Sequence, residues 1–377
     1  MTYPLPDTNP EDVGLDRPTL ERLSDLIDGH IAEGRYPGAQ IAVARYGRLA
    51  YTKTFGLART EPEPVTARDD TLWLLFSNTK VITAAGIWRL VEDGSIRFAD
   101  PVAMYVPEFD RHGKDAITIM ELMTHQAGFP EADVPPEAWE DHELLREAVS
   151  DFAPQWPPGS KVHYHGRAAH WVAAVLIEAV SGVDYRAFIR DRILAPIGLD
   201  NDVFVGLGAE HQGRAADMHE PTEDGDTIQL HPFMNTPAAR AAGMPGSGGF
   251  ATARGMAAFY QMMLQNGRLN GSRLFGPRTI EFVTRNFTGD RIDEGMGMPM
   301  HRGIGPHRRG HTETIRGLGT LASPSTFGHG GVGSSYCWAD PDSGVSFAYI
   351  TNNRVAEPWH TQRTDIVSSL AHAAIDY

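Results

Sequence analysis

The chain has 377 residues, of which 41% are hydrophobic and 21% charged, so it can bury a large core and is not disordered as a whole. Lys and Arg number 33 against 48 Asp and Glu, and this formal net charge of −15 argues against nucleic acid and anionic membranes as partners. The single cysteine, Cys337, excludes an intramolecular disulfide. It lies in a strand-like run, which favours a buried core thiol over a reactive one.

The N-terminal residues predict a cytoplasmic location. They have neither a basic start nor an apolar stretch, so we expect no signal peptide. No apolar run approaches the roughly 18 residues that a membrane span needs. The sequence therefore predicts a soluble cytoplasmic protein with no membrane partner, and it holds no indication of the oligomeric state.

The first predicted elements are a helix and a hairpin. Residues 18–34 carry leucines and isoleucines at helical spacing and end at a glycine. Two strand-like runs, 40–45 and 48–55, follow on either side of Tyr46-Gly47, which predicts a hairpin.

The middle of the chain is different in character. From Ser77 to about residue 195 the pattern is mostly helical, with Pro-rich breaks. Residues 205–250 and 288–328 are rich in Gly, Pro and His and have little periodicity, which predicts long loops that line a site. Trp139, Trp156 and Phe129 fit either an apolar pocket or the core.

The C-terminal part returns to strands. Runs at 334–339 and 345–351 flank a strong turn sequence, and a helix is expected over 363–375. Because isolated hairpins are marginal, the simplest fold joins both chain ends in one antiparallel sheet with flanking helices. We therefore predict a two-lobe α/β (α+β) fold, in which 1–75 and 250–377 form the sheet lobe and 76–249 a mostly helical lobe. The active site is expected in the cleft between them.

The first chemical motif is the S-x-x-K sequence Phe76-Ser77-Asn78-Thr79-Lys80. The residues after it are apolar on nearly every face of a predicted helix, on which Ser77 and Lys80 share one side. A lysine buried there has a lowered pKa and can accept the serine proton. Taken alone, the pattern also fits a capping serine and a solvated lysine, although this helix leaves Lys80 no obvious solvated face.

Two further motifs complete the set. Tyr164 lies at a loop-to-helix junction, where its hydroxyl can enter a cleft, although a lone buried tyrosine with one hydrogen bond is the commoner case. The run Gly328-His329-Gly330-Gly331-Val332-Gly333 leads into a strand and allows close backbone approach to a ligand. It fits an ordinary glycine-rich turn equally well, but a strand-edge N–H could also complete an oxyanion hole with the Ser77 N–H.

With these three motifs in this order, the chain resembles the serine β-lactamase and penicillin-binding-protein superfamily, and most of all class C β-lactamases and family VIII carboxylesterases. The resemblance covers about residues 18–370. It implies that Ser77 is acylated, that Lys80 and Tyr164 move its proton, and that no metal or cofactor takes part. His329, Gly330 and Gly331 occupy the third motif, and the backbone N–H groups of Ser77 and Val332 bind the oxyanion. Which of Lys80 and Tyr164 is the working base stays open.

Two departures from that family bear on the substrate. In β-lactamases the tyrosine motif ends in asparagine and the third motif begins with lysine, whereas this chain has Gly166 and His329. His329 is expected to be a weaker, pH-dependent substitute for a lysine that holds a carboxylate. Hydrolysis of small-molecule esters through an acyl-enzyme is therefore favoured over hydrolysis of amides or β-lactams and over acyl transfer.

Three other functions remain as alternatives. His163 and His165 have an H-x-H spacing that could bind zinc in a metal hydrolase, although no H-E-x-x-H accompanies them. An α/β-hydrolase would need G-x-S-x-G, and the nearest sequence, Pro245-Gly246-Ser247-Gly248-Gly249, lacks the first glycine. A sensor that is acylated without turnover would keep the same three motifs.

Overall fold

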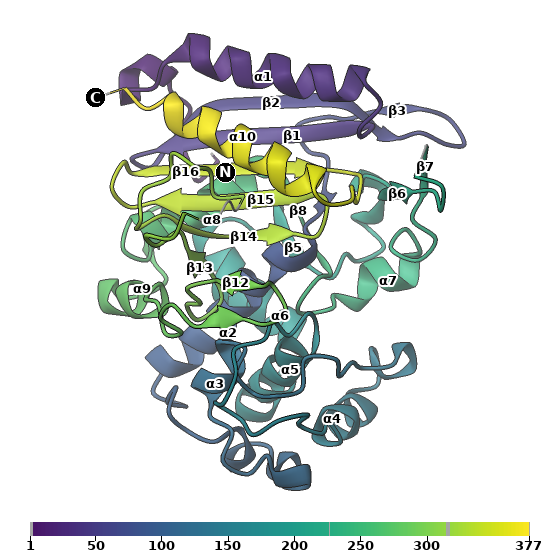
Figure 1. The fold of residues 1–377 in the computed structure, drawn as a ribbon, viewed down its shortest axis with the longest axis vertical. Coiled ribbons are helices and arrows are strands. Elements are labelled where there is room, and N and C mark those ends of the chain that lie inside the picture. Colours follow the sequence, from purple (N-terminus) through teal and green to yellow (C-terminus); the bar gives the residue numbers. More distant parts are fainter. Residues whose placement is uncertain (1–2, 226, 314–316, 377) are drawn as a thin grey trace.

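The fold is organised around one large antiparallel sheet. The computed structural model describes residues 3–225, 227–313 and 317–376. Both ends of the chain contribute strands to this sheet, and Figure 1 shows strands from both ends of the colour scale side by side. In spatial order the strands are β13 (His307–Arg308), β14 (Phe327–Gly331), β15 (Ser335–Asp340), β16 (Val345–Thr351), β1 (Gly38–Arg45), β2 (Arg48–Arg59) and β3 (Val65–Thr66).

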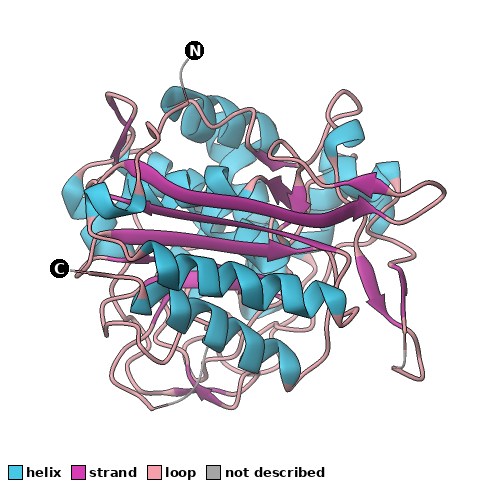
Figure 2. Ribbon diagram, turned by 90° about the horizontal axis from the view of Figure 1, so that it is seen from above, coloured by secondary structure: helices cyan, strands magenta, loops and turns pink. Residues whose placement is uncertain are grey.

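Helices cover both faces of this sheet. The helices α1 (Arg17–Ala32) and α10 (Trp359–Ala373) lie against one face, where Figure 2 shows them side by side, and α8 (Ala253–Leu264) packs on the other. Every residue of β1, β15 and β16 is consequently buried, which explains why these strands carry apolar side chains on both sides. The pairing of β1 with β16 places Ala39 opposite Thr351 and fixes the register between the two chain ends.

The helical part is centred on two apolar helices. The helix α2 (Thr79–Glu92) packs against α5 (Ala168–Ser181), and nearly every side chain of α2 is buried. Smaller helices surround them: α3 (Ile119–Met123), α4 (His142–Ser150), α6 (Tyr185–Ile189), α7 (Pro237–Ala242) and α9 (Pro277–Val283). A small three-stranded sheet connects this helical part to the large sheet. Its strands, in spatial order, are β4 (Trp73–Leu74), β8 (Gly249–Ala251) and β5 (Val203–Val205).

The two long loop regions contain short strands that the sequence does not predict. They are β6 (His219–Pro221) with β7 (Ile228–Leu230), β11 (Ile292–Asp293) with β12 (Met298–Pro299), and β13, which joins the large sheet. A further hairpin pairs β9 (Arg268–Leu269) with β10 (Ser272–Arg273). The two-lobe fold class, the first helix and both hairpins are confirmed to within a few residues. The last helix, expected over 363–375, begins four residues earlier, at Trp359.

Two apolar clusters hold these layers together. One lies between the sheet and α1 and α10, and the other runs from the opposite face of the sheet through α2 and α5. The predicted boundaries at residues 75 and 250 stay a prediction, because this second cluster crosses them without interruption. Cys337 is buried as expected, and burial raises the pKa of its thiol. Within 3–225, 227–313 and 317–376, we find no helix that is long and apolar enough to cross a membrane.

Candidate active site

Ser77 lies in a tight turn directly before α2. The turn is the 3-10 segment Phe76–Asn78, and Phe76 has a φ of 44°, in the left-handed region that a non-glycine residue enters at a cost. Strained backbone of this kind is typical of functional sites, where the surrounding structure imposes it. Ser77 lines a cleft of about 690 Å³, so its hydroxyl is placed at a wall that a ligand can reach.

Lys80 is the first partner of Ser77. Its ammonium nitrogen Nζ lies 3.1 Å from Ser77 Oγ, and it donates to the carbonyl oxygens of Gly166 at 2.7 Å and Gly246 at 2.8 Å. The side chain is fully buried, and burial lowers the pKa of Lys80 from its ordinary value, with Arg302 adding to the effect. Because a carbonyl oxygen only accepts, two Nζ positions are fixed by backbone and the third faces Ser77.

Tyr164 is the second partner and comes from a different segment. Its hydroxyl donates to Ser77 Oγ at 2.9 Å, so the serine oxygen lies between a lysine and a tyrosine. The position of Tyr164 depends on Asp293, which is fully buried and accepts the Tyr164 backbone N–H at 2.9 Å. The other oxygen of Asp293 pairs with Arg302 at 2.7 Å, and the Arg302 guanidinium lies 4.8 Å from the centre of the Tyr164 ring.

The third motif reaches the site through close backbone contact. A Cβ on Gly331 would collide with the carbonyl oxygen of Leu75, so only glycine lets β14 approach the Ser77 turn this closely. Asn78 spans the same gap, with its side-chain amide 2.7 Å from Ser335 Oγ. His329, Gly330 and Gly331 all line the cleft, as the sequence predicts.

The expectation of a pH-dependent cation at His329 is wrong. Its Nδ1 lies 2.7 Å from the Gly330 carbonyl oxygen, so this nitrogen carries a proton. Burial lowers the pKa of His329 to about 3, and Lys80 and Arg302 contribute to this shift. The imidazole is therefore neutral at any ordinary pH and cannot replace a lysine ammonium as a carboxylate ligand.

The two predicted oxyanion donors lie on the same cleft. Ser77 and Val332 both line it, and within the described part of the chain neither backbone N–H donates to another residue. Ser334 N donates to the carbonyl oxygen of Gly331 at 3.1 Å, so residues 331–334 form a turn with Val332 at its second position. An unpaired N–H at such a place is available to a ligand oxygen.

A match to a family model identifies the family to which the chain belongs. The model described as "Beta-lactamase" matches residues 23–371. The chain belongs to the β-lactamase family. This β-lactamase-family protein is accordingly a serine hydrolase by kinship, as the sequence motifs predict.

Individual relatives agree with this assignment. The esterase/beta-lactamase LipL of Mycobacterium tuberculosis is 28% identical over 77% of this chain and 71% of its own length. A putative D-alanyl-D-alanine carboxypeptidase of Salmonella paratyphi B is 27% identical over 93% of this chain and 87% of its own.

Solved structures extend the likeness to nearly the whole chain. A penicillin-binding protein homologue from Caulobacter crescentus superposes with a TM-score of 0.81 and 28% identity, over 96% of this chain and 99% of that one. A family VIII carboxylesterase gives a TM-score of 0.81 and 27% identity, over 95% and 99%.

The cleft of this β-lactamase-family protein has an apolar and a polar wall. One wall comes from the predicted loop 288–328 and includes Met296, in a turn, and Met298 and Met300, at β12 and directly after it. The other comes from the start of α10 and the loop before it, which the sequence gives no reason to select. Among the described residues of the loop 205–250, only Pro221 lines the cleft, and none of Trp139, Trp156 and Phe129 does.

The residues that would serve a metal hydrolase or an α/β-hydrolase have other roles in this structure. His165 donates from Nδ1 to the His163 carbonyl oxygen at 2.7 Å and accepts the Phe129 backbone N–H on Nε2 at 3.1 Å, so neither nitrogen is available to a metal. Ser247 lies next to Gly246, whose carbonyl holds Lys80, and the large sheet is antiparallel rather than the parallel sheet of an α/β-hydrolase.

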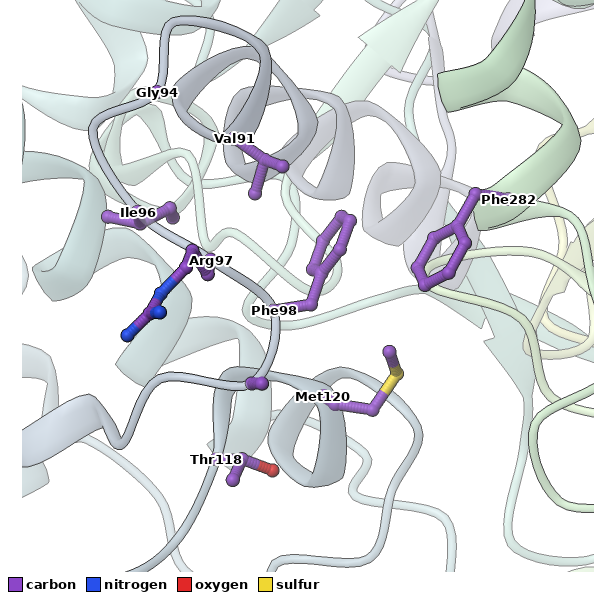
Figure 3. Close-up of a pocket in the computed structure, with 9 residues that line it drawn as sticks. Val91, Gly94, Ile96, Arg97, Phe98, Thr118, Met120 and Phe282 are labelled. Carbon is purple, nitrogen blue, oxygen red and sulfur yellow. The ribbon is translucent and has the colours of Figure 1, made fainter.

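A second cavity, of about 590 Å³, lies between the end of α2, the segment after it, α3 and α9. Figure 3 shows Val91, Phe98, Met120 and Phe282 gathered around it, with the Arg97 side chain directed away from the two rings. It shares no residue with the Ser77 cleft, and its walls are mainly apolar.

Proposed function

We propose that this protein is a carboxylesterase that hydrolyses small-molecule esters through an acyl-enzyme on Ser77. The observation that carries the proposal is the position of Ser77 Oγ, 3.1 Å from Lys80 Nζ and 2.9 Å from Tyr164 OH at the wall of a cleft. A serine hydroxyl becomes an effective nucleophile when such a neighbour accepts its proton.

The proposed reaction has two halves. Ser77 Oγ attacks the ester carbonyl carbon while its proton passes to the Lys80–Tyr164 pair, and the carbonyl oxygen becomes an oxyanion held by the N–H groups of Ser77 and Val332. The tetrahedral intermediate collapses to the acyl-enzyme, and the alcohol leaves with the proton. Water then attacks the acyl carbon with the same proton transfer, which releases the acid and restores Ser77.

The geometry of Lys80 supports a role as a base in its neutral form. The carbonyl oxygens of Gly166 and Gly246 accept two N–H bonds from Nζ. A neutral amine has two such hydrogens, so its lone pair is then directed at the third neighbour, Ser77 Oγ. The lowered pKa of Lys80, caused mainly by burial, makes this neutral form more accessible.

The charges of the cleft support an ester in preference to a β-lactam. Among the described residues, the two arginines that line it are balanced by neighbouring carboxylates: Arg302 pairs with Asp293 at 2.7 Å, and Arg354 lies 3.6 Å from Glu220. His329 is neutral, and Gly166 has no side chain. An anionic β-lactam would therefore find no unpaired cation among these groups, whereas a neutral ester needs none.

The test compares wild type with Ser77→Ala on p-nitrophenyl acetate, p-nitrophenyl butyrate and nitrocefin, with intact-mass detection of acyl adducts. We expect ester turnover and an adduct in the wild type only, with little nitrocefin hydrolysis. Nitrocefin turnover that exceeds ester turnover would instead indicate a β-lactamase. An adduct that forms once and does not turn over would indicate a sensor, and ester turnover that survives in Ser77→Ala would exclude the serine mechanism.

A further inference from the structure

Arg363, on α10, is a buried cation without a counter-ion. Its side chain is 1% exposed, and no carboxylate of the described residues lies within ion-pair distance of it. Three aromatic rings enclose the guanidinium instead: the carbon Cζ lies 5.2 Å from the Tyr36 ring centre, 5.3 Å from Tyr349 and 5.2 Å from Trp359. Cation–π contacts of this kind stabilise a desolvated guanidinium but do not cancel its charge.

The hydrogen bonds of Arg363 are directed at the cleft on one side and at α1 on the other. Nη2 donates to the Gly333 carbonyl oxygen at 2.7 Å and lies 3.3 Å from His360 Nδ1. Nη1 donates to Tyr349 OH at 2.7 Å and approaches Thr351 Oγ1 at 3.5 Å.

This second direction leads to a fixed chain of hydroxyl groups. Tyr349 OH donates to Tyr36 OH at 2.8 Å, and Tyr36 OH lies 3.0 Å from His30 Nδ1 on α1. Because Arg363 can only donate, it sets the direction of this chain and is itself held in one orientation.

Gly333 is the third residue of the turn that carries Val332. The bond from Ser334 N to Gly331 O fixes the peptide between residues 331 and 332, and in a trans peptide the Val332 N–H points opposite to that carbonyl. Gly333 has a φ of 64°, and a Cβ there would collide with the Val355 carbonyl oxygen. Its own carbonyl accepts from Val355 N at 3.0 Å and from Arg363, so two donors hold the far side of the turn.

We propose that Arg363 is a positioning residue for the oxyanion hole, which it serves by holding the Gly333 carbonyl so that the Val332 N–H faces the cleft. This inference rests on the proposed function. A donor contributes to catalysis when it is fixed before charge develops, because no reorganisation is then needed at the moment of reaction. The charge of Arg363 faces the turn through the Gly333 carbonyl, and its sign favours an anion on the other side.

The experiment uses Arg363→Met, which keeps the apolar stem and removes the fork, and Arg363→Lys, which keeps the charge. The matched control is Arg45→Met. Arg45 is 3% exposed and donates to backbone carbonyl oxygens, among them those of Ser343 and Val13, as Arg363 does to that of Gly333. Arg45 pairs with Val345, at the end of β16 that is far from Gly333. The neighbouring strand β15 has six residues, so the two ends of the sheet are about 17 Å apart.

Two quantities are measured in each variant: kcat and KM for p-nitrophenyl butyrate, and the Kd of phenylboronic acid, which forms a tetrahedral adduct with a serine hydroxyl. We expect Arg363→Met to lower kcat by about 10-fold to 100-fold and to weaken boronate binding by a similar factor, with KM changed by less than about 3-fold. Arg363→Lys is expected to lose at least about 3-fold in both, because an ammonium cannot bond Gly333 and Tyr349 together in the planar geometry of the fork.

Arg45→Met separates positioning from general stability. We expect it to lower the thermal midpoint as Arg363→Met does, and to leave kcat and boronate affinity within about 2-fold of wild type, which is the effect of a remote substitution. Equal losses in both Met variants, or wild-type values in folded Arg363→Met, would overturn the proposal. If Arg363→Met does not fold, wild-type values in Arg363→Lys overturn it.

A wild type that binds boronate but hydrolyses no ester contradicts the proposed function alone, while the boronate affinities of the variants still decide the role of Arg363. A wild type that does neither contradicts both proposals.

Discussion

At the scale of single residues, burial determines the charge of the groups around Ser77. Lys80 is held by backbone carbonyl oxygens rather than by a carboxylate, and the cost of desolvating its ammonium outweighs the opposing effect of Tyr164, so its pKa is lowered. The same cost lowers the pKa of His329 to about 3. Lys80 can therefore lose its proton at a lower pH than an exposed lysine does. His329, by contrast, stays neutral over the pH range in which a histidine usually titrates.

A pH profile distinguishes these two groups. If neutral Lys80 is the base, kcat/KM rises with pH as Lys80 loses its proton, and its lowered pKa moves this rise below the ordinary value of 10.5. His329 has a pKa of about 3 and is already neutral from pH 5 to 8, so it adds no limb there. We expect His329→Gln to change the height of the ester kcat/KM profile but not its shape. Loss of a limb between pH 5 and 8 in this variant would show that His329 titrates during the reaction.

At the scale of structural elements, one buried ion pair connects the Tyr164 segment to the loop after β12. Asp293, on β11, accepts the Tyr164 N–H and pairs with Arg302, and both charged side chains are almost fully buried. A buried pair of this type adds little net stability, but removal of one partner leaves an uncompensated charge. The cost of such a change should therefore far exceed that of breaking an exposed pair.

The chain offers a matched comparison at adjacent positions. We expect Asp293→Ala to lower the free energy of unfolding by about 3–5 kcal/mol, because Arg302 is left buried and unpaired. Glu294 forms an exposed pair with Lys161 at 3.1 Å, and Glu294→Ala should cost less than about 1 kcal/mol. Urea denaturation of both variants measures the difference. Similar losses in the two would mean that water reaches Arg302 in the Asp293 variant.

The same elements show what could be predicted from the sequence. The helix after Ser77, the hairpins and the three motifs follow from local periodicity and spacing, which one segment of chain carries by itself. Asp293, Arg302 and Arg363 could not be found in this way, because each acts on a segment more than 20 residues distant and lies in no pattern. The short strands of 288–308 depend on pairing between loops and have no periodicity of their own.

At the scale of the whole molecule, buried neutral histidines should make the fold sensitive to acid. Burial lowers the pKa of His165 and of His372 to about 4, and that of His329 and of His360 to about 3. Burial also lowers the pKa of His125 and of His170 well below 6.5. Unfolded histidines take up protons as the pH falls through about 6.5, whereas these stay neutral in the folded protein, so acid favours unfolding.

We expect the free energy of unfolding to be intact above pH 6.5 and to fall between about pH 6.5 and 4.5, by up to about 1.4 kcal/mol per pH unit for each such histidine. Urea midpoints across this range measure the slope. His170→Leu, which replaces one of the six by an apolar side chain of similar size, should reduce the slope by about one proton's share. A midpoint that stays constant from pH 7 to 5 would mean that these histidines are protonated in the folded protein.

The pairing of β1 with β16 has a consequence for biosynthesis. Ala39 cannot pair with Thr351 until Thr351 has left the ribosome, 312 residues later. This interval is about 15–60 s at ordinary translation rates. During that time a nascent chain presents a largely apolar strand whose one edge has no partner. Such an edge is a template for association with other chains. Expression yield of this protein should therefore depend on the chaperones that occupy nascent chains, independently of how stable the finished fold is.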